Sequence, residues 1–325
     1  KGRKHAAEPL EHLSPRFAAL IACAVIGFAA INTLYIAPQT GWFRQQSPLD
    51  APAAMQTPVH VTFGDAYELL GYTLHQTAAA PGEAVPITLY WRALRSLDHD
   101  YRPQVQLVNP RQTEAWATSE GFFVGSSPIQ HTPDYFVSDV HLPRIFDNAP
   151  PYVGHITVKL IDSQTDQPLS LADGSTMLTL DQTVRVIGAN LRVNRVFDTQ
   201  IGGTLELWCS SFDPTSDGIQ VDLYWHVVAP FTTSDLRTFI HGLDGAGNQI
   251  EGADGPLFAG DYAPKDWLPG QTLIDTYYLP YSIDMREVAV GLYIPDADRL
   301  PAIQDGQPVP DNRLLLPLGR QDCLN

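Results

Sequence analysis

The sequence Leu89-Tyr90-Trp91, which ends the stretch Thr88-Leu89-Tyr90-Trp91, recurs 134 positions later as Leu223-Tyr224-Trp225 in the stretch Val221-Asp222-Leu223-Tyr224-Trp225. Successive side chains of a β-strand point to opposite faces, so the tyrosine and the tryptophan of each copy must lie on different faces. The indole is the better core residue of the two, because a buried tyrosine also needs a partner for its hydroxyl group. We therefore expect two strands that bury Trp91 and Trp225 in two separate cores.

Other landmarks recur at nearly the same offset along the chain. Leu-Tyr-Trp follows the turn Pro81-Gly82-Glu83 in the first copy and the turn Ser216-Asp217-Gly218 in the second. Further matching segments are 105–109 with 239–244, 158–162 with 290–294, and Leu142-Pro143 with Leu279-Pro280. A spacing that is kept over the whole length indicates an internal duplication.

The two copies have the pattern of all-β domains. Each contains seven or more short β-rich segments, and the 27 prolines and 24 glycines are scattered between them as turn residues. We predict an all-β fold of two tandem Ig-like antiparallel β-sandwiches, at residues 59–188 and 189–325, preceded by one N-terminal transmembrane α-helix. The short connection at 187–190 predicts that the two sandwiches touch each other.

The N-terminal region predicts a single membrane span at residues 16–37. Residues 17–31 carry no polar side chain, and a bilayer core of about 30 Å needs roughly 20 helical residues. Four basic residues lie before or at the start of the span, which predicts that residues 1–15 are cytoplasmic and residues 38–325 extracytoplasmic. The proline-rich residues 38–58 are then expected to form a linker. Membrane lipid is accordingly the predicted partner of residues 16–37.

Alternative interpretations of the N-terminus stay open at this point. A cleaved signal peptide has the same charge polarity, but its apolar region is usually about 7–15 residues long and ends at small residues. Cys23 stands in a sequence that resembles a bacterial lipoprotein box, although the apolar run continues beyond it. The first residue is Lys1 rather than Met, so the chain either lacks an initiating segment or is the tail of a longer membrane protein.

The composition is acidic and contains few cysteines. A formal net charge of −16 comes from 36 acidic and 20 basic residues. An acidic surface repels phosphate groups, so we expect no nucleic-acid partner and no docking of the external region on anionic lipid. Cys209 and Cys323 lie in the predicted extracytoplasmic region, where oxidation is permitted. They either form a disulfide or remain free thiols, because sequence does not give the Cα separation that the bond requires.

Motifs that would name a reaction are absent from the sequence. The hydrolase, metalloprotease and nucleotide-binding patterns G-x-S-x-G, H-E-x-x-H and G-x-x-x-x-G-K-[ST] do not occur. The acidic segment 244–254 fails the calcium-loop pattern at its third and sixth positions, and a hairpin turn explains its Asp and Gly residues equally well. We therefore predict no catalytic residue, no metal site and no cofactor.

Aromatic residues in or beside the predicted loops are the candidate interaction residues. Rings exposed in polar loops suit stacking on sugars or burial in a protein interface. The competing interpretation is that several of them cap the ends of small sandwiches. The candidates are Trp116, Phe122, Phe123 and Tyr135 in the first copy and Phe258, Tyr262 and Trp267 in the second.

Several segments resemble a region of membrane proteins from Chloroflexus-type (Chloroflexota) bacteria. They are 63–72 (FGDAYELLGY), 81–83, 87–91, 254–256, 267–270 (WLPG), 275–277 and 291–293. In that group, similar tandem β-sandwiches follow the last membrane helix of polytopic glycosyltransferase-like proteins, which are similar to dolichyl-phosphate-mannose-dependent enzymes. The resemblance implies the fold from Thr33 onward more than an activity, because its motifs are strand and turn signatures. This chain departs from those enzymes, since it has one predicted membrane helix and no counterpart of their acidic catalytic loop.

These observations predict a single-pass, membrane-anchored extracytoplasmic protein. Its sandwiches are expected to be a non-catalytic interaction, accessory or structural component of a cell-envelope or membrane complex, with a protein partner or a second copy of the chain. One alternative is that the chain is the C-terminal, non-catalytic portion of a polytopic GT-C-type glycosyltransferase. Another is a carbohydrate-binding module whose aromatic loops bind glycans.

Overall fold

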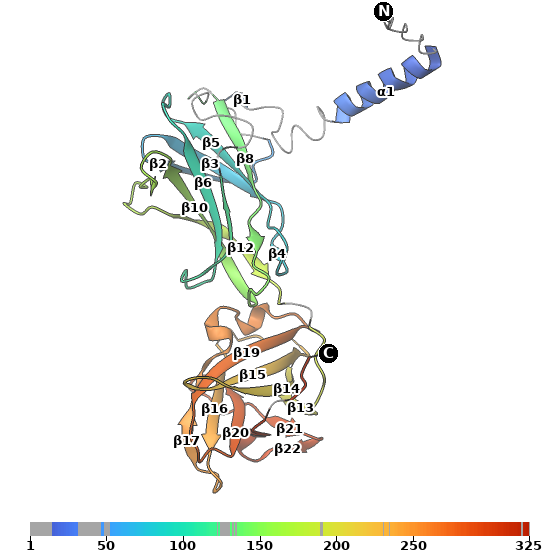
Figure 1. Cartoon of the computed structure of the whole chain (residues 1–325), viewed down its shortest axis with the longest axis vertical. Coiled ribbons are helices and arrows are strands. Elements are labelled where there is room, and N and C mark those ends of the chain that lie inside the picture. Colours follow the sequence, from blue (N-terminus) through green and yellow to red (C-terminus); the bar gives the residue numbers. More distant parts are fainter. Residues whose placement is uncertain are drawn as a thin grey trace, which may run out of the picture.

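The computed structural model describes residues 15–31, 47–48, 53–121, 123, 131, 133, 135–188, 191–229, 231–233, 235–319 and 321–324. Strands dominate these residues and form four sheets within them (Figure 1). The short pairing of β4 (Ala78–Ala79) with β12 (Leu178–Val186) is parallel, and the other pairings of the described strands are antiparallel. The prediction of an all-β, antiparallel fold is therefore confirmed.

The α-helix among the described residues, α1, spans Pro15–Ile31. It begins at a proline, whose missing N–H group costs nothing in the first turn of a helix. Apolar side chains on α1, including Ile26 and Phe28, are exposed. Within the described part of the chain, the structure contains no helix with both the length and the apolar character needed to cross a membrane. Residues 32–37, the predicted end of the span, lie outside the described residues.

The first unit is built from strands between Ser47 and Val186. Besides β4 and β12, these are β1 (Ser47–Pro48), β2 (Thr57–Phe63), β3 (Tyr67–Leu74), β5 (Ile87–Ala93), β6 (Tyr101–Val108), β7 (Ala115–Glu120), β8 (Tyr135–His141), β9 (Arg144–Ile145), β10 (Tyr152–Asp162) and β11 (Gln167–Pro168). One sheet has the order β1-β8-β5-β3-β2, and the other has the order β4-β12-β10-β6-β7-β9 with β11 beside β10.

The second unit is built from strands between Thr199 and Pro317. These are β13 (Thr199–Ile201), β14 (Leu205–Pro214), β15 (Gly218–Val227), β16 (Arg237–Leu243), β17 (Gln249–Gly252), β18 (Gly255–Pro256), β19 (Thr272–Pro280), β20 (Glu287–Tyr293), β21 (Ala302–Gln304), β22 (Gln307–Pro308) and β23 (Leu314–Pro317). One sheet has the order β19-β15-β14-β13-β21-β22, and the other has the order β17-β16-β20-β23 with β18 beside β16. Short 3₁₀ turns are η3 (Leu257–Gly260), η4 (Pro264–Asp266) and η5 (Pro310–Asn312).

The two units share one strand order. The series β8-β5-β3-β2 corresponds to β19-β15-β14-β13, and β12-β10-β6-β7 corresponds to β23-β20-β16-β17. Trp91 and Trp225 fall on the equivalent strands β5 and β15, while Leu160 and Leu292 fall on β10 and β20. These are the strand matches that the sequence repeats predict. In constant-type immunoglobulin domains, the second and third strands belong to different sheets. Here β2, β3 and β5 form a meander within one sheet, so the strand order differs.

A β-bulge recurs at the same place in both units. Leu70 is the extra residue of β3 beside the residue that pairs with Trp91. Trp208 is the extra residue of β14 beside the residue that pairs with Trp225. Bulges bend a strand and increase its twist, and they tend to persist within a family. Matching bulges are thus a structural sign of the duplication, independent of the sequence landmarks.

The equivalent tryptophans Trp91 and Trp225 lie between the two sheets of their units. Trp91 and Trp225 have no exposed surface, and each lies in a cluster of buried apolar residues drawn from both sheets of its unit. The prediction for the tryptophans is therefore confirmed. Tyr90 and Tyr224 belong to separate, smaller clusters on the opposite faces of their strands and are also buried.

Part of the region predicted as a linker belongs to the first unit. β1 pairs with β8, and β2 begins at Thr57, two residues before the predicted start of the first sandwich. β2 packs closely on β3, because a Cβ atom at Gly71 would lie only 2.3 Å from the carbonyl oxygen of Thr57. Proline is compatible with these strands since both lie at sheet edges, where a missing N–H group breaks no ladder.

Candidate functional site

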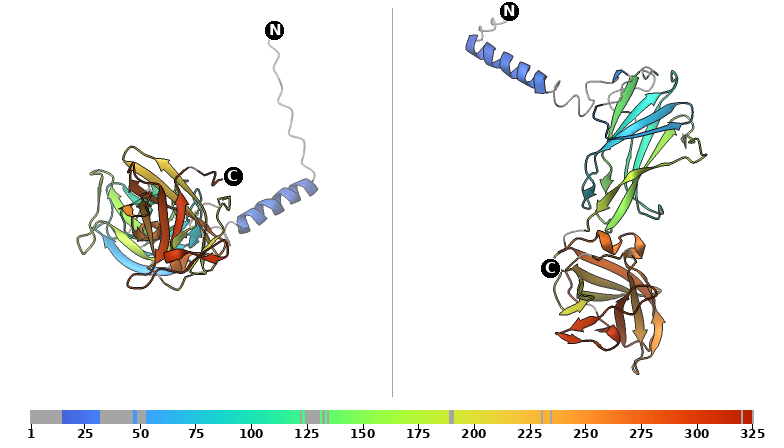
Figure 2. Two further views of the ribbon diagram at one scale, coloured as in Figure 1. Left: turned by 90° about the horizontal axis from the view of Figure 1, so that it is seen from below. Right: turned by 180° about the vertical axis from the view of Figure 1, so that it is seen from behind.

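The two units lie end to end (Figures 1 and 2). A carboxylate clamp joins them. Asp261, which follows η3, is buried, and Arg111 donates to its two carboxylate oxygens over 2.9 and 2.7 Å. Asn109 donates to Asp261 Oδ2 over 3.1 Å, and the amide of Val153 donates to the Asp261 carbonyl oxygen over 3.1 Å. Bidentate arginine–carboxylate pairs combine strength with a fixed geometry. The two units therefore touch, as the short connection between them predicts.

The loop that supplies this arginine is held in shape by its first residue. Asn109 Oδ1 accepts hydrogen bonds from the amides of Thr113 and Glu114. The equivalent residue of the second unit, Asp244, accepts from the amides of Ala246 and Asn248. The acidic segment considered as a calcium loop is therefore the hairpin turn between β16 and β17. Among the described residues, no group of three or more His, Cys, Asp or Glu side chains is arranged to hold a metal ion.

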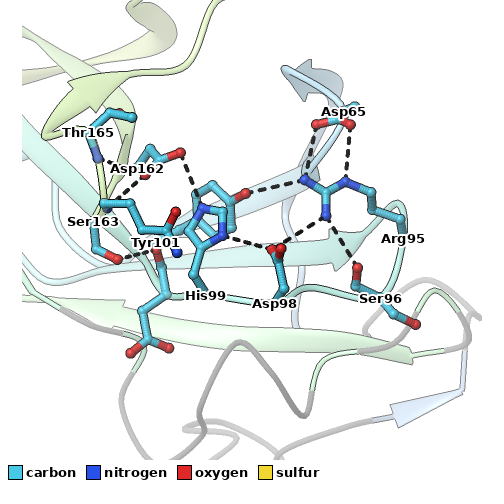
Figure 3. Close-up of polar contacts among 11 residues, drawn as sticks. Asp65, Arg95, Ser96, Asp98, His99, Tyr101, Asp162, Ser163 and Thr165 are labelled. Atoms are coloured by element: carbon cyan, nitrogen blue, oxygen red, sulfur yellow. Dashed lines mark hydrogen bonds and ion pairs between the residues drawn. The ribbon is translucent and has the colours of Figure 1, made fainter.

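A polar network of the first unit lies at its other end, around His99 (Figure 3). His99 Nδ1 lies 2.8 Å from Asp98 Oδ1, and His99 Nε2 lies 3.2 Å from Asp162 Oδ2. Arg95 donates to both carboxylate oxygens of Asp65, over 3.1 and 3.4 Å. We call these five residues the His99 cluster. It ties the turn before β3, the β5–β6 connection and the end of β10 together.

The electrostatics of the His99 cluster suit a structural latch. Partial burial opposes protonation of His99, but the hydrogen bonds to Asp98 and Asp162 outweigh it and raise the His99 pKa. Burial likewise opposes ionisation of Asp162, yet the amides of the following turn and His99 lower the Asp162 pKa. The nearby hydroxyl of Ser163 donates to the carbonyl oxygen of Asp100 over 2.5 Å and not to the imidazole. His99 therefore does not activate this serine as a nucleophile.

Each unit also contains a buried aspartate at the same position of the equivalent strands β8 and β19. Asp139 of β8 pairs with His141 over 2.8 Å, and Asp275 of β19 accepts from the hydroxyl of Tyr277 over 2.6 Å. Asp275 further accepts the amide of Phe258 over 3.0 Å, which fixes η3 directly before Asp261. Burial raises the Asp275 pKa to about 7, against the opposing effect of these hydrogen bonds. Asp275 thus supports the loop that carries the inter-unit clamp.

A disulfide joins Cys209 of β14 to Cys323 in the C-terminal tail, with a Cα–Cα separation of 5.7 Å. The sequence leaves this pairing open, and the structure contains it. Tyr224 packs beside the bond in the same small cluster. The tail also meets the segment that leads into the second unit, because the amide of Asn194 donates to the Cys323 carbonyl oxygen over 2.9 Å. The disulfide therefore anchors the tail beside the entrance to the second unit.

The predicted interaction aromatics are mostly core residues, which corrects the expectation that they are exposed. Phe123, Tyr262 and Trp267 are buried, and such rings cannot stack on a ligand without unfolding. Trp116 and Phe258 are partly buried and pack on the cores of their units. Tyr135 begins β8. Phe122 lies outside the described residues.

The hydrogen bonds of these rings give the physical reason. The Tyr262 hydroxyl donates to the Asp266 carbonyl oxygen over 3.1 Å, and Trp267 Nε1 donates to the Tyr262 carbonyl oxygen over 3.1 Å. Phe123 stacks on Tyr67 with ring centres 5.1 Å apart. These rings pack into the cores of their units from the ends of the sandwiches. The capping interpretation therefore describes Phe123, Tyr262 and Trp267.

The aromatic surface that sequence reasoning missed lies at the other end of the second unit. Tyr278, Tyr281 and Ile283 are 65%, 67% and 75% exposed. They belong to the end of β19 and the β19–β20 loop, and we call this surface the outer tip. The sequence indicates this surface through the apolar segment 277–283 (YYLPYSI). Strand alternation there turns the side chain of Tyr278 to the face of β19 opposite that of Tyr277.

Neither models of protein families nor curated protein sequences give a match to this chain.

Proposed function

We propose that this chain is a non-catalytic, membrane-tethered interaction module of the extracytoplasmic side. In this proposal α1 and the apolar residues after it form the tether, and the two units form a rod with its interaction surface at the outer tip. The sandwiches serve as an accessory or structural part of a cell-envelope complex. A place after the membrane helices of a glycosyltransferase-like protein, which the sequence resemblance implies, is compatible with this role.

Three observations support the proposed location. The Cys209–Cys323 disulfide is a bond that persists in oxidising compartments and is rare in the cytosol. Exposed apolar side chains on α1, such as Val25 and Phe28, suit an apolar environment better than water. The basic residues before α1 and the acidic region after it favour a cytoplasmic N-terminus.

The observation that carries the proposed role is the exposure of Tyr278, Tyr281 and Ile283 at the outer tip. Because the two units are copies of one fold, the outer tip of the second unit is equivalent to one particular end of the first unit. That end of the first unit is the one that contacts the second unit. There the β6–β7 loop supplies Arg111 to the clamp, and its equivalent is the β16–β17 turn at the outer tip. The same end of the fold is thus used for docking in one copy and is uncovered in the other.

The charge around the outer tip selects the kind of partner. Asp217, Asp284 and Glu287 are exposed near these residues, and Arg286 is an exposed cation among them. Such an acidic rim repels anionic lipid, nucleic acid and the tip of a second copy. It is complementary to a protein surface with an apolar centre and a basic rim, and this is the partner that we propose.

Photo-crosslinking tests this proposal in cells that carry the full chain. A photoreactive phenylalanine analogue in place of Tyr281 should yield one adduct of defined mass. Ile283→Asp should abolish the adduct while leaving the melting temperature unchanged, because position 283 is exposed. The same analogue in place of Leu142, an exposed apolar residue of the first unit, is the control and should yield none. Equal adducts from positions 281 and 142, or no adduct from position 281, would contradict the proposal.

A further inference from the structure

A groove between the two units, distinct from the outer tip, has the features of a ligand site. Its walls come from β4, β10 and β12 of the first unit and from η4 of the second. Its volume is about 450 Å³. Small-molecule sites in proteins typically occupy about 300–1,000 Å³ and often lie at domain boundaries.

A bulge in β12 shapes the first wall of this groove. Between His155 and Thr157 of β10 the register shifts, because β12 takes four residues to cover that two-residue step. The extra residues include Asp181 and Gln182, both of which line the groove. The backbone N–H group of Gln182 donates to the Tyr72 hydroxyl, over 3.3 Å, and not to a neighbouring strand. Bulges of this kind commonly re-aim side chains beside functional sites.

Two buried polar atoms of the wall have no hydrogen-bond partner in the described protein. They are Gln182 Oε1, an acceptor, and Arg185 Nε, a donor. Buried polar groups are nearly always paired, and an unpaired one destabilises the fold. The guanidinium of Arg185 approaches Asp266 Oδ1 only to 3.8 Å, beyond hydrogen-bond distance. Both atoms are closed to solvent, whereas the side chains of Arg185 and Asp266 keep 35% and 25% of their surface exposed and are open to a ligand in the groove.

The second unit supplies the facing wall through Asp266, and this wall is rigidly supported. The backbone of Asp266 accepts the Tyr262 hydroxyl, and its amide donates to the Ala263 carbonyl oxygen over 2.9 Å. Trp267, the next residue, is buried and donates to the Tyr262 backbone. The buried aromatics thus hold a carboxylate in position opposite Arg185.

We propose that the inter-unit groove binds a neutral, polyhydroxylated ligand, a short stretch of glycan. Hydroxyl groups both donate and accept hydrogen bonds. A sugar can therefore donate to the carboxylates of Asp181 and Asp266. It can also bind the side-chain amide of Gln182 and accept from the guanidinium of Arg185. Two carboxylates against one guanidinium disfavour phosphates and uronic acids. Because both units contribute, the bound glycan also bridges them. This site differs from the aromatic loops that the sequence suggested for glycan binding.

Titration calorimetry on the full chain, in a detergent without a sugar headgroup, tests the proposal. The probes are neutral disaccharides and trisaccharides of glucose, mannose, galactose and arabinose, with inorganic phosphate, glucuronate and a Gly-Ser peptide for comparison. At least one neutral sugar should bind, while phosphate and glucuronate should not. Gln182→Met and Arg185→Met should each weaken that binding at least about tenfold, the effect of losing a hydrogen bond to a buried polar group.

Matched variants separate loss of binding from loss of folding. Asp181 is exposed, so Asp181→Asn should keep the melting temperature and still weaken sugar binding. Gln106→Met, on β6 and away from the groove, should leave binding unchanged. The proposal is overturned if no neutral sugar binds, if all groove variants bind as the wild type does, or if phosphate or the peptide binds more tightly than every sugar. None of these outcomes depends on the partner of the outer tip.

Discussion

The indole of Trp225 fills the space between the two sheets of the second unit, and this position gives a prediction at the residue scale. Trp225→Ala should lower the free energy of unfolding of that unit by about 3–5 kcal/mol, the usual cost of emptying a buried aromatic site. Tyr224→Ala should cost less, and His226→Ala, at a half-buried position, less again. Thermal melts of the full chain measure this order. A larger loss for His226 than for Trp225 would mean that the two faces of β15 have been exchanged.

The buried carboxyl group of Asp275 makes stability depend on pH. Its pKa is about 7 in the folded chain, against an ordinary value near 3.9 in the unfolded chain. The folded state binds the proton more tightly, so the free energy of unfolding should fall as the pH rises from about 4 to about 7. At about 1.4 kcal/mol per unit, this fall is on the order of 4 kcal/mol. Asp275→Asn should therefore gain stability relative to the wild type across this window, in urea titrations at several pH values.

The exposed Asp284 provides the control for this titration. Asp284→Asn replaces an exposed side chain away from Asp275 and should change the free energy of unfolding little in the same urea titrations. A constant difference between Asp275→Asn and the wild type over the same range would show that Asp275 does not titrate there.

At the scale of elements, the disulfide should account for much of the order in the C-terminal tail. Cys209 and Cys323 are 114 residues apart, so the bond restricts a long loop of the unfolded chain. Replacing both with serine should cost the second unit about 2–5 kcal/mol, and reduction of the wild type should have a similar effect. Cys23→Ser, at an exposed free cysteine, should change nothing. Denaturant unfolding with and without reductant measures both. Identical curves would indicate that the tail is held by its other contacts.

Some strands and loops of this fold can be predicted from the sequence, and others cannot. The repeated Leu-Tyr-Trp segments predict β5 and β15, their faces and the burial of Trp91 and Trp225, because these depend on strand alternation alone. The bulge at Asp181 is not predictable in this way, since it depends on how β12 meets its neighbours. The burial of Tyr262 likewise depends on which loop closes the sandwich, and loop composition does not reveal that.

At the scale of the whole molecule, the two copies have diverged mainly at their ends. In both equivalent turns the side chain of the first residue, Asn109 or Asp244, accepts backbone amides of the turn, but the turn after Asn109 carries Arg111 and docks on the second unit. The turn after Asp244 has small residues instead and leaves the outer tip uncovered. Sequence alone misses the clamp, because its partners Arg111 and Asp261 are far apart in the chain and neither stands in a recognisable motif.

The clamp gives the last prediction, on the stiffness of the rod. Arg111→Met removes the bidentate hydrogen bonds to Asp261 and leaves a buried carboxylate with only Asn109 and water. If the contact between the two units is weakened by about one or two kcal/mol, the ratio of docked to undocked units falls about five- to thirtyfold. The two units should then keep their melting temperatures but move more freely, so small-angle scattering should show a broader distribution of distances. Protease cleavage near residues 187–191 should accelerate about fivefold or more. Arg144→Met, which breaks an exposed pair with Asp147, is the control and should alter neither measurement. Unchanged scattering from the Arg111 variant would mean that the groove walls and the Val153 contact suffice to align the units.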